Sequence, residues 1–188
     1  MKKLLITGFD PFGGSDSNPS ELAVQLLPDV LGDFEIRKCI VPTVFGAATR
    51  IALKAADSFC PDVILCIGVA AGRDAVTPER VAINLQDARI PDNAGRQPTD
   101  APVVPGAPAA YFATVPLKKM VAAIQEQGLP ARISNTAGTF VCNDLFYGLA
   151  HHYAGTPVKI GFIHVPATDV LSVRSIAEAL AAAISALE

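Results

Sequence analysis

Short apolar runs alternate with segments of helical periodicity along most of the chain. Several runs, such as residues 63–68, are apolar nearly throughout, which is typical of strands covered on both faces of a sheet. The pattern predicts strands at 3–8, 35–42, 63–68, 81–87, 131–135 and 158–165, and helices at 19–27, 45–59, 117–127, 141–153 and 170–187. This alternation indicates an α/β fold, a three-layer α/β/α arrangement in which helices cover both faces of a largely parallel, twisted open sheet.

The order of these elements also predicts where a site would form. In open parallel sheets, sites gather in loops at the carboxyl ends of the strands. The loops at 7–17, 69–79, 135–142 and 164–169 would all lie near that edge. Residues 88–116 differ, because their six prolines predict a long irregular excursion. No linker divides the chain, so we expect one α/β domain spanning 1–188.

Composition narrows the class of protein. Hydrophobic residues make up 51% of the chain, which is typical of a compact globular protein. The net charge of −3, without a basic run, argues against nucleic acid or membrane as a partner. Residues 1–7 are too short an apolar run for a signal peptide, so we expect a cytoplasmic protein. The cysteines lack zinc spacing and predict free thiols without a metal: Cys39, Cys60, Cys66 and Cys142.

Cys142 is the candidate nucleophile. It follows a polar, glycine-containing turn, 134–139, and stands at the start of a predicted helix. Unpaired backbone N–H groups and the positive end of the helix dipole favour an anion there. We therefore expect the thiol pKa to fall from its free value of about 8.5 toward neutrality. The alternative is a buried small hydrophobe, an interpretation that fits Cys66 and Cys39 within their apolar runs.

His164 is the histidine best placed to act as a general base. It ends an apolar run directly before Val165-Pro166, at the carboxyl end of a predicted strand. A buried structural histidine is the alternative. His151 and His152 fall late in a predicted helix, where a surface location is favoured.

A third group should orient the imidazole. Glu79 lies in a loop directly before the run at 81 and is the first candidate. Asp92 is the competing candidate for the residue that orients the imidazole. The alternative for Glu79 is a surface ion pair with Arg80 or Arg73.

Two glycine-containing loops favour neither nucleotide nor phosphate binding. Residues 8–14 lack the Gly-Lys-Ser/Thr ending of a phosphate loop, and 68–72 miss the dinucleotide fingerprint. Phe9 and Phe12 flank the turn at Asp10 and are candidates for the apolar wall of a small pocket. The alternative is that both rings anchor the loop to the core.

Long blocks of sequence surround these candidates. They are Ile6-Thr7-Gly8-Phe9-Asp10-Pro11-Phe12-Gly13-Gly14 with Asn18-Pro19-Ser20, Thr77-Pro78-Glu79-Arg80-Val81-Ala82-Ile83-Asn84, Asp87-Ala88-Arg89-Ile90-Pro91-Asp92-Asn93, Ser134-Asn135-Thr136-Ala137-Gly138-Thr139-Phe140-Val141-Cys142-Asn143 and Gly161-Phe162-Ile163-His164-Val165-Pro166. In this order, from residue 4 to about 166, the chain resembles the pyrrolidone-carboxylate peptidases, the pyroglutamyl-peptidase I family of cysteine peptidases.

The resemblance implies an α/β/α peptidase that needs no metal or cofactor and removes N-terminal pyroglutamate from peptides. It implies a Cys-His-Glu acyl-transfer mechanism in which Cys142 is the nucleophile, His164 the general base and acid, and Glu79 the orienting residue. It places Arg89 at the oxyanion. The remaining implied positions bind substrate: Phe9, Phe12, Phe140 and Val141 at the lactam ring, and Asn18 at backbone polar groups. Family members are commonly cytoplasmic tetramers, so the resemblance implies a homo-oligomer, a tetramer or a dimer.

The chain also departs from the family pattern. Val69 stands where bacterial members often have Gln, and Asp144 replaces a frequent His, adding a negative charge expected to raise the thiol pKa. Two alternative functions stay open. One is a catalytically weak or silent homologue that binds pyroglutamyl peptides. The other is a nucleoside-processing transferase of similar sheet type, because a fold does not fix a function.

Overall fold

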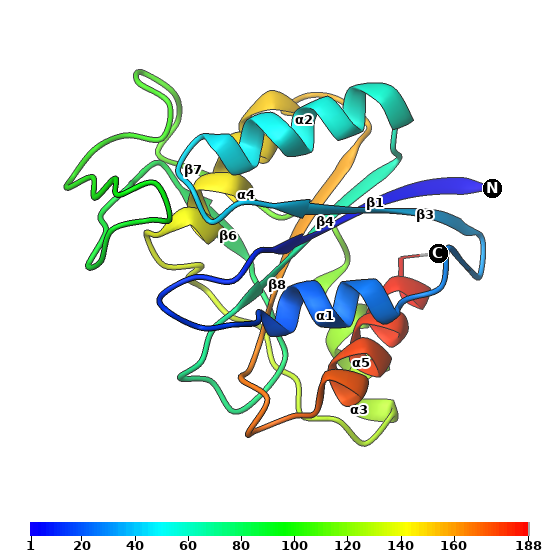
Figure 1. The fold of residues 1–188 in the computed structure, drawn as a ribbon. Helices are drawn as coiled ribbons and strands as arrows, with labels where there is room; N and C mark the ends of the chain where they lie inside the picture. The colour runs from blue at the N-terminus through cyan, green and yellow to red at the C-terminus, as the bar shows by residue number, and fades with distance from the viewer. Residues whose placement is uncertain (188) are drawn as a thin grey trace.

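The computed structural model describes residues 1–187 and contains a central six-stranded sheet (Figure 1). The inner strands run parallel to one another, and the short edge strands β2 and β5 are antiparallel to their neighbours. In spatial order the strands are β2 (Val30–Leu31), β3 (Phe34–Val41), β1 (Lys2–Phe9), β4 (Val63–Val69), β8 (Lys159–Val165) and β5 (Thr77–Pro78). The predicted α/β fold with a largely parallel sheet is confirmed.

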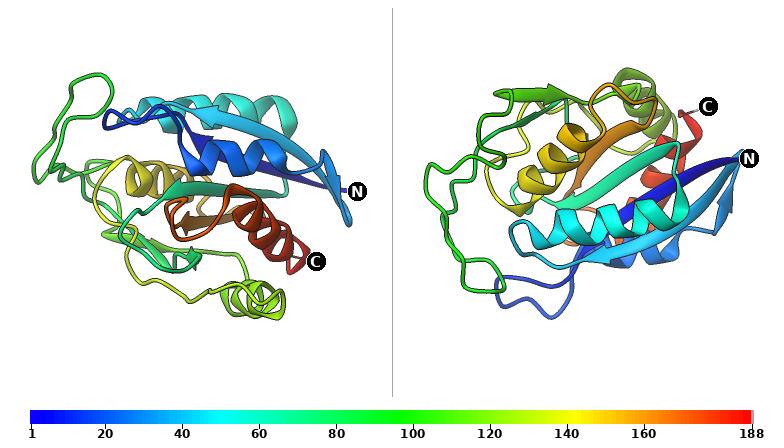
Figure 2. Two further views of the ribbon diagram at one scale, coloured as in Figure 1. Left: turned by 60° about the horizontal axis from the view of Figure 1, so that its bottom comes forward. Right: turned by 90° about the horizontal axis from the view of Figure 1, so that it is seen from above.

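Helices cover both faces of this sheet, as Figures 1 and 2 show. One face carries three helices and the other carries two, and each layer encloses its own hydrophobic cluster. Along β4, Leu65 faces the first cluster, whereas Ile64 and Cys66 face the second, because successive side chains of a strand alternate between the faces. The first face holds α1 (Pro19–Leu26), α3 (Leu117–Glu126) and α5 (Val173–Ser185), and the second holds α2 (Ala47–Phe59) and α4 (Val141–His152).

Some predicted strands are wrong. The run at 131–135 forms only isolated bridges, Val76 with Ala131 and Glu79 with Ser134. The predicted strand at 81–87 stops at Ile83 and pairs outside the central sheet, as β6 (Val81–Ile83) with β7 (Ala110–Phe112). Asn143 explains the early stop, because Nδ2 of its side-chain amide donates hydrogen bonds to the backbone carbonyls of Ile83 and Leu85. The short strands β2, β5 and β7 have no periodicity long enough to predict them.

The carboxyl ends of the parallel strands meet at one edge of the sheet, on the left in Figure 1. The excursion at 88–116, green in Figure 1, extends beyond this edge. It is anchored by Asp92, whose carboxylate accepts the backbone N–H groups of Phe45, Ala94 and Arg96. Within residues 1–187, no helix is both long and apolar enough to cross a membrane.

Candidate active site

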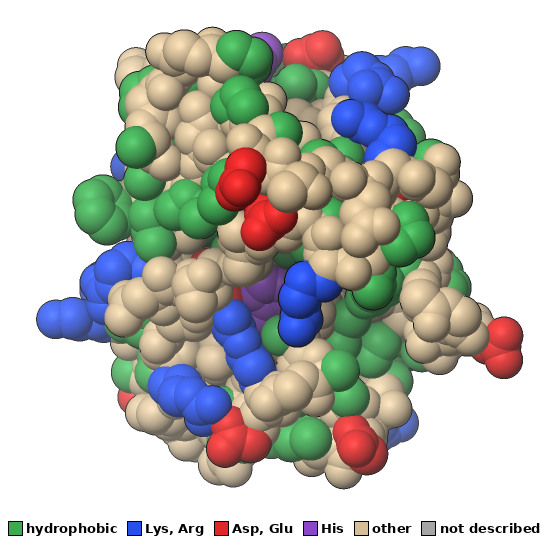
Figure 3. All heavy atoms as spheres, turned by 90° about the vertical axis from the view of Figure 1, so that its left-hand side faces the viewer, with side chains coloured by type: hydrophobic (Ala, Val, Ile, Leu, Met, Phe, Trp, Pro, Cys, Tyr) green, Lys and Arg blue, Asp and Glu red, His purple; other side chains and the backbone are tan. Residues whose placement is uncertain are grey.

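A cavity of about 700 Å³ opens at the carboxyl edge of the sheet. Figure 3 looks onto this side of the molecule and shows a histidine side chain at the bottom of a hollow, between Lys or Arg side chains. Three of the four loops that the sequence predicts to meet here, 7–17, 69–79 and 135–142, line this cavity, and the segment 87–90 takes the place of 164–169. The lining residues are Phe12, Val69, Ala70, Ala71, Gly72, Arg73, Asp87, Arg89, Ile90, Gly138, Thr139 and Phe140.

The imidazole of His164 is oriented by Glu79. Nδ1 of His164 lies 2.7 Å from Oε1 of Glu79, and both side chains are buried. Because a carboxylate only accepts, Nδ1 carries the proton and Nε2 is left with its lone pair. Nε2 makes no hydrogen bond within residues 1–187. Burial lowers the pKa of His164, although the hydrogen bond and charge of Glu79 partly offset this.

Glu79 is held in place by the backbone at the end of β5. Its N–H donates to the carbonyl of Phe162 at 2.8 Å. Its carboxylate also accepts a hydrogen bond from Nη1 of Arg73 at 2.6 Å, so the ion pair with Arg73 and the contact with His164 coexist. Asp92, the competing carboxylate, is committed to backbone N–H groups near the start of α2. The structure therefore places Glu79, and not Asp92, on the imidazole.

Cys142 lies in the first turn of α4, directly over β4. A Cβ built at Gly68 would be 2.9 Å from the sulfur, so the thiol occupies the space that a side chain at 68 would need. Gly68 is paired in register with His164 on the neighbouring strand. The three predicted catalytic residues are thus brought to one place by the end of β5, by β8 and by the beginning of α4, next to Gly68 of β4.

The expected lowering of the thiol pKa is wrong for this structure. Burial raises the pKa of Cys142 to about 12, and electrostatic interactions with the acidic groups of Glu79 and Cys66 add to that rise. Arg73 and the backbone N–H at the helix start oppose it. Desolvation of a charge outweighs a helix terminus here, because the terminus contributes only about 0.3–2 kcal/mol. The resting site therefore holds a neutral thiol.

Asp144 does not act on the thiol as expected. Its carboxylate accepts the backbone N–H of Gly46 at 2.8 Å and a hydrogen bond from the side chain of Gln86. Gly46 is the N-cap of α2, so this carboxylate joins the starts of α2 and α4. The acidic groups that raise the thiol pKa are Glu79 and Cys66.

The predicted substrate-binding residues divide into two groups. Phe12 and Phe140 line the cavity, with ring centroids 6.2 Å apart, and so does the exposed Arg89. Phe9 and Val141 are not among the lining residues, because both are packed into the core beneath α2 and α4.

Asn18 is likewise absent from the lining. It caps α1, since Oδ1 accepts the N–H of Ser20 at 3.0 Å and Nδ2 donates to the carbonyl of Asp10 at 2.9 Å. Its amide therefore fixes the loop that carries Phe12, and its own hydrogen-bonding capacity is used internally.

Two residues of this site escaped the sequence analysis. The sequence presents Gly68 only as part of an incomplete nucleotide motif, and Arg73 only as a surface partner for Glu79. A glycine ending an otherwise apolar strand is the signal for Gly68, because it marks close approach of another group. Arg73 gives no periodic signal, since the local chain turns back to place Thr77 and Glu79 on its guanidinium and its third partner, Thr136, is 63 residues away. Within residues 1–187, no group of His, Cys, Asp and Glu is arranged to hold a metal ion.

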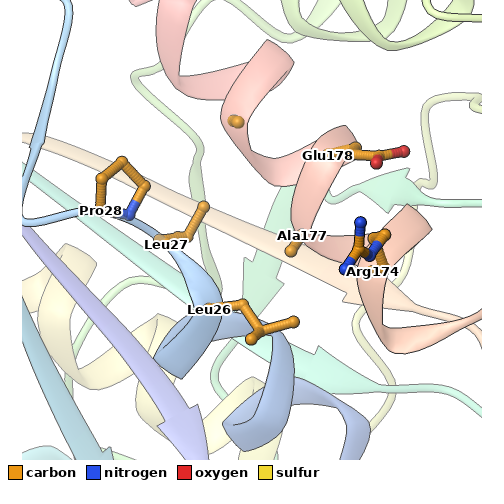
Figure 4. A pocket seen from close by; sticks show the side chains of 7 residues that line it. Leu26, Leu27, Pro28, Arg174, Ala177 and Glu178 are labelled. Carbon is orange, nitrogen blue, oxygen red and sulfur yellow. The ribbon is translucent and has the colours of Figure 1, made fainter.

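A second cavity, of about 310 Å³, lies between the end of α1 and α5 (Figure 4). Figure 4 shows Leu26, Arg174 and Glu178 around it. Its lining includes no cysteine or histidine, so it offers no nucleophile paired with a base.

Comparison with known proteins matches nearly the whole chain. Residues 2–186 match the family model described as pyroglutamyl peptidase. The pyrrolidone-carboxylate peptidase of Vibrio vulnificus strain YJ016 is 52% identical over 167 residues, covering 88% of this chain and 79% of the relative. The relative of the same name from Escherichia fergusonii is 52% identical over 168 residues, covering 88% and 78%.

Solved structures are similar to this chain over nearly its whole length. The crystal structure of Bacillus amyloliquefaciens pyroglutamyl peptidase I superposes with a TM-score of 0.95 at 44% identity, covering 100% of this chain and 97% of that one. A mutant pyrrolidone carboxyl peptidase from the hyperthermophile Pyrococcus furiosus gives a TM-score of 0.93 at 40% identity, covering 98% and 97%.

Proposed function

Because the chain belongs to the pyroglutamyl peptidase family and is a peptidase, we propose that it removes N-terminal pyroglutamate from peptides by a Cys-His-Glu mechanism. The observation that carries the mechanism is the buried His164–Glu79 hydrogen bond of 2.7 Å beside the Cys142 sulfur. A nucleophile, a base and an orienting carboxylate are the parts that acyl transfer requires.

In the first step, the Cys142 sulfur attacks the carbonyl carbon that links pyroglutamate to the next residue. Nε2 of His164 takes the thiol proton as the S–C bond forms. Arg89 and the backbone N–H of Cys142 stabilise the negative charge that develops on the carbonyl oxygen. Arg89 is exposed at the cavity, and its side chain makes no ion pair or hydrogen bond within residues 1–187, so it is free for this contact.

The C–N bond then breaks, and His164 gives its proton to the departing amine. The imidazole is neutral again and activates a water molecule, which attacks the thioester. Pyroglutamate leaves as the free acid, and the thiol recovers its proton from His164. Glu79 keeps the Nδ1–H tautomer throughout, because its Oε1 accepts that proton's hydrogen bond.

The cavity suits a residue without a charged amine. Phe12 and Phe140 supply aromatic walls, and Val69, Ala70 and Ala71 add small apolar surface. The cyclic amide of pyroglutamate is neutral, whereas a free N-terminal ammonium would lose its hydration against these groups at a cost of several kcal/mol. The apolar lining therefore favours pyroglutamate over ordinary N-terminal residues.

Release of a fluorescent amine from an L-pyroglutamyl amide tests this function, with and without prior treatment by iodoacetamide. We expect turnover that is lost when Cys142 is alkylated, as identified by mass spectrometry. Cys60 is exposed and is therefore also expected to react, so the Cys60→Ser variant is the control and should show the same loss. Folded, reduced protein that binds the amide without turnover would contradict the proposal.

We also infer a cytoplasmic homo-oligomer, a tetramer or a dimer. The mechanism needs a reduced thiol, which the cytoplasm maintains. Phe112 on β7 is 71% exposed, which suits a surface that another subunit covers. Sedimentation velocity of the wild type and of Phe112→Ser tests this, because a single monomeric species in the wild type would contradict it.

A further inference from the structure

Arg73, in the loop after β4, joins the segments that surround the candidate nucleophile. Nη1 donates to Oε1 of Glu79 at 2.6 Å and also to the hydroxyl of Thr77. Nη2 donates to the backbone carbonyl of Thr136 at 2.9 Å. Thr136 belongs to the turn that leads into α4 and Cys142. One guanidinium therefore ties together the loop after β4, the edge strand β5 and the turn before the nucleophile.

The two partners of the Glu79 carboxylate converge on one oxygen. Nη1 of Arg73 and Nδ1 of His164 lie 2.6 and 2.7 Å from Oε1. Oε2 is buried and has no hydrogen-bond partner within residues 1–187. A fully buried carboxylate needs a compensating charge. Arg73 supplies it, so Glu79 orients the imidazole without requiring that ring to be protonated.

We propose that Arg73 is a positioning residue that fixes Oε1 of Glu79 on the Nδ1–H of His164 and keeps the imidazole neutral and ready to accept the thiol proton. This rests on the proposed function, because Arg73 acts within the same acyl transfer. Arg73 itself exchanges no proton and contacts no reacting atom. It is distinct from Arg89, whose side chain makes no hydrogen bond or ion pair within residues 1–187 and is available to the oxyanion.

The proposal predicts a change in the pKa of His164, because charged groups around the imidazole shift that pKa. Burial lowers the pKa of His164, Glu79 raises it and Arg73 lowers it. Cys142 on α4, Cys66 on β4 and Cys39 on β3 lie on this side of the sheet. Burial raises the pKa of Cys66 and of Cys142 to about 12, so both are neutral near pH 7, and burial raises the pKa of Cys39 as well. When the positive charge of Arg73 is removed, it no longer opposes the effect of Glu79, so the pKa of His164 rises.

Other charged groups at the cavity wall and on α4 could also affect the pKa of His164. Asp87 and Arg89 are exposed there and therefore screened by solvent, and Asp144 on α4 is engaged with Gly46 and Gln86. Arg73 is only 22% exposed and bonded directly to the carboxylate that holds the ring. Its removal is thus the change expected to dominate.

The test compares the wild type with Arg73→Gln and Arg73→Lys, using kcat and KM for the L-pyroglutamyl amide between pH 5 and 9. For Arg73→Gln we expect kcat to fall roughly 30- to 100-fold with KM changed less than about threefold, because geometry at the base is lost. The acid limb of kcat/KM should move to higher pH. Arg73→Lys keeps the charge but cannot bridge both acceptors, so kcat should be intermediate and the acid limb near that of the wild type.

A measurement without substrate separates this proposal from the proposed function. The chain has three histidines, so the imidazole of His164 is assigned in NMR spectra by comparison with His164→Ala. Its titration should move to higher pH in Arg73→Gln. If the wild type shows no turnover but this shift is present, the proposed function fails and the coupling of Arg73 to His164 stands.

Arg132→Gln is the matched control. Arg132 pairs with Asp74, the direct neighbour of Arg73, but that pair is exposed and outside the cavity, so kinetics and titration should match the wild type. Wild-type kcat with an unmoved titration in Arg73→Gln would overturn the proposal, and so would a change confined to KM. If Arg73→Gln does not fold, wild-type kcat in Arg73→Lys would overturn it.

Discussion

The sulfur of Cys142 lies against the backbone of Gly68, at the place where any other residue would carry its Cβ. That Cβ would be 2.9 Å from the sulfur and 2.9 Å from Cζ of Phe162, closer than real Cβ contacts. Gly68 is also the register partner of His164. The absence of one side chain on β4 thus lets the first turn of α4 bring the nucleophile beside the base.

Gly68→Ala should therefore damage the site more than the fold. Overpacking of this kind costs about 1–3 kcal/mol of the free energy of unfolding, and we expect kcat/KM to fall at least about 100-fold as the thiol is displaced. Urea unfolding and amide hydrolysis measure the two effects. Gly72→Ala is the stability control, because a Cβ there meets nothing within 4 Å. Wild-type activity in Gly68→Ala would show that the thiol does not need this space.

Substitution of Cys142, His164 and Glu79 should show how much each side chain contributes to turnover. Cys142→Ala and His164→Ala should each abolish measurable turnover, since one removes the nucleophile and the other the base. Glu79→Gln should cost less than either, because a side chain of the same size retains part of the geometry. Measured kcat/KM values, with urea unfolding to verify folding, give the ranking. Comparable turnover in Cys142→Ala and wild type would refute the mechanism.

Stability should fall at both acid and alkaline pH for reasons within this site. Burial lowers the pKa of His164 below its ordinary 6.5, so below pH 6.5 the unfolded chain binds a proton that the native site refuses, and stability falls as pH falls. Burial raises the pKa of Cys66 and of Cys142 from 9.0 to about 12, so above pH 9 the unfolded chain releases protons that the native state keeps. Stability therefore falls as pH rises.

Urea midpoints measured between pH 5 and 10 check both limbs. Cys142→Ala removes one of the two thiols whose pKa is raised to about 12, so its alkaline loss of stability should be smaller than that of the wild type. His164→Ala should lose less stability on the acid side. A flat profile above pH 9 in the wild type would contradict burial as the cause.

Cys60→Gly should stabilise the protein. Cys60 ends α2 with φ 53° and ψ 63°, the left-handed conformation, and its side chain is exposed. That conformation costs a residue with a Cβ about 1–2 kcal/mol, whereas glycine adopts it freely at a smaller entropic cost, so we expect a net gain of about 0.5–1 kcal/mol. Thermal or urea unfolding measures it. Cys60→Ser keeps the Cβ and should show no gain, which separates the backbone effect from loss of the thiol.

The sequence by itself determined the alternation of strands and helices, the mostly parallel sheet and the family, all of which the structure and the comparisons confirm. These features are encoded locally, since a buried strand or an amphipathic helix shows in the spacing of its own residues. Cys142 and His164 became candidates in the same way, because each stands at the end of a predicted element.

The tertiary structure decided what depends on contacts between distant segments. Position in the chain leaves Asp92 as a competitor of Glu79, and the approach of β5 to β8 is what places the Glu79 carboxylate on His164, 85 residues away. The contact of Arg73 with the carbonyl of Thr136, 63 residues away, arises in the same way. The direction of the Cys142 pKa was also decided there, because desolvation is set by everything packed around the sulfur, whereas the sequence reveals only the helix start beneath it.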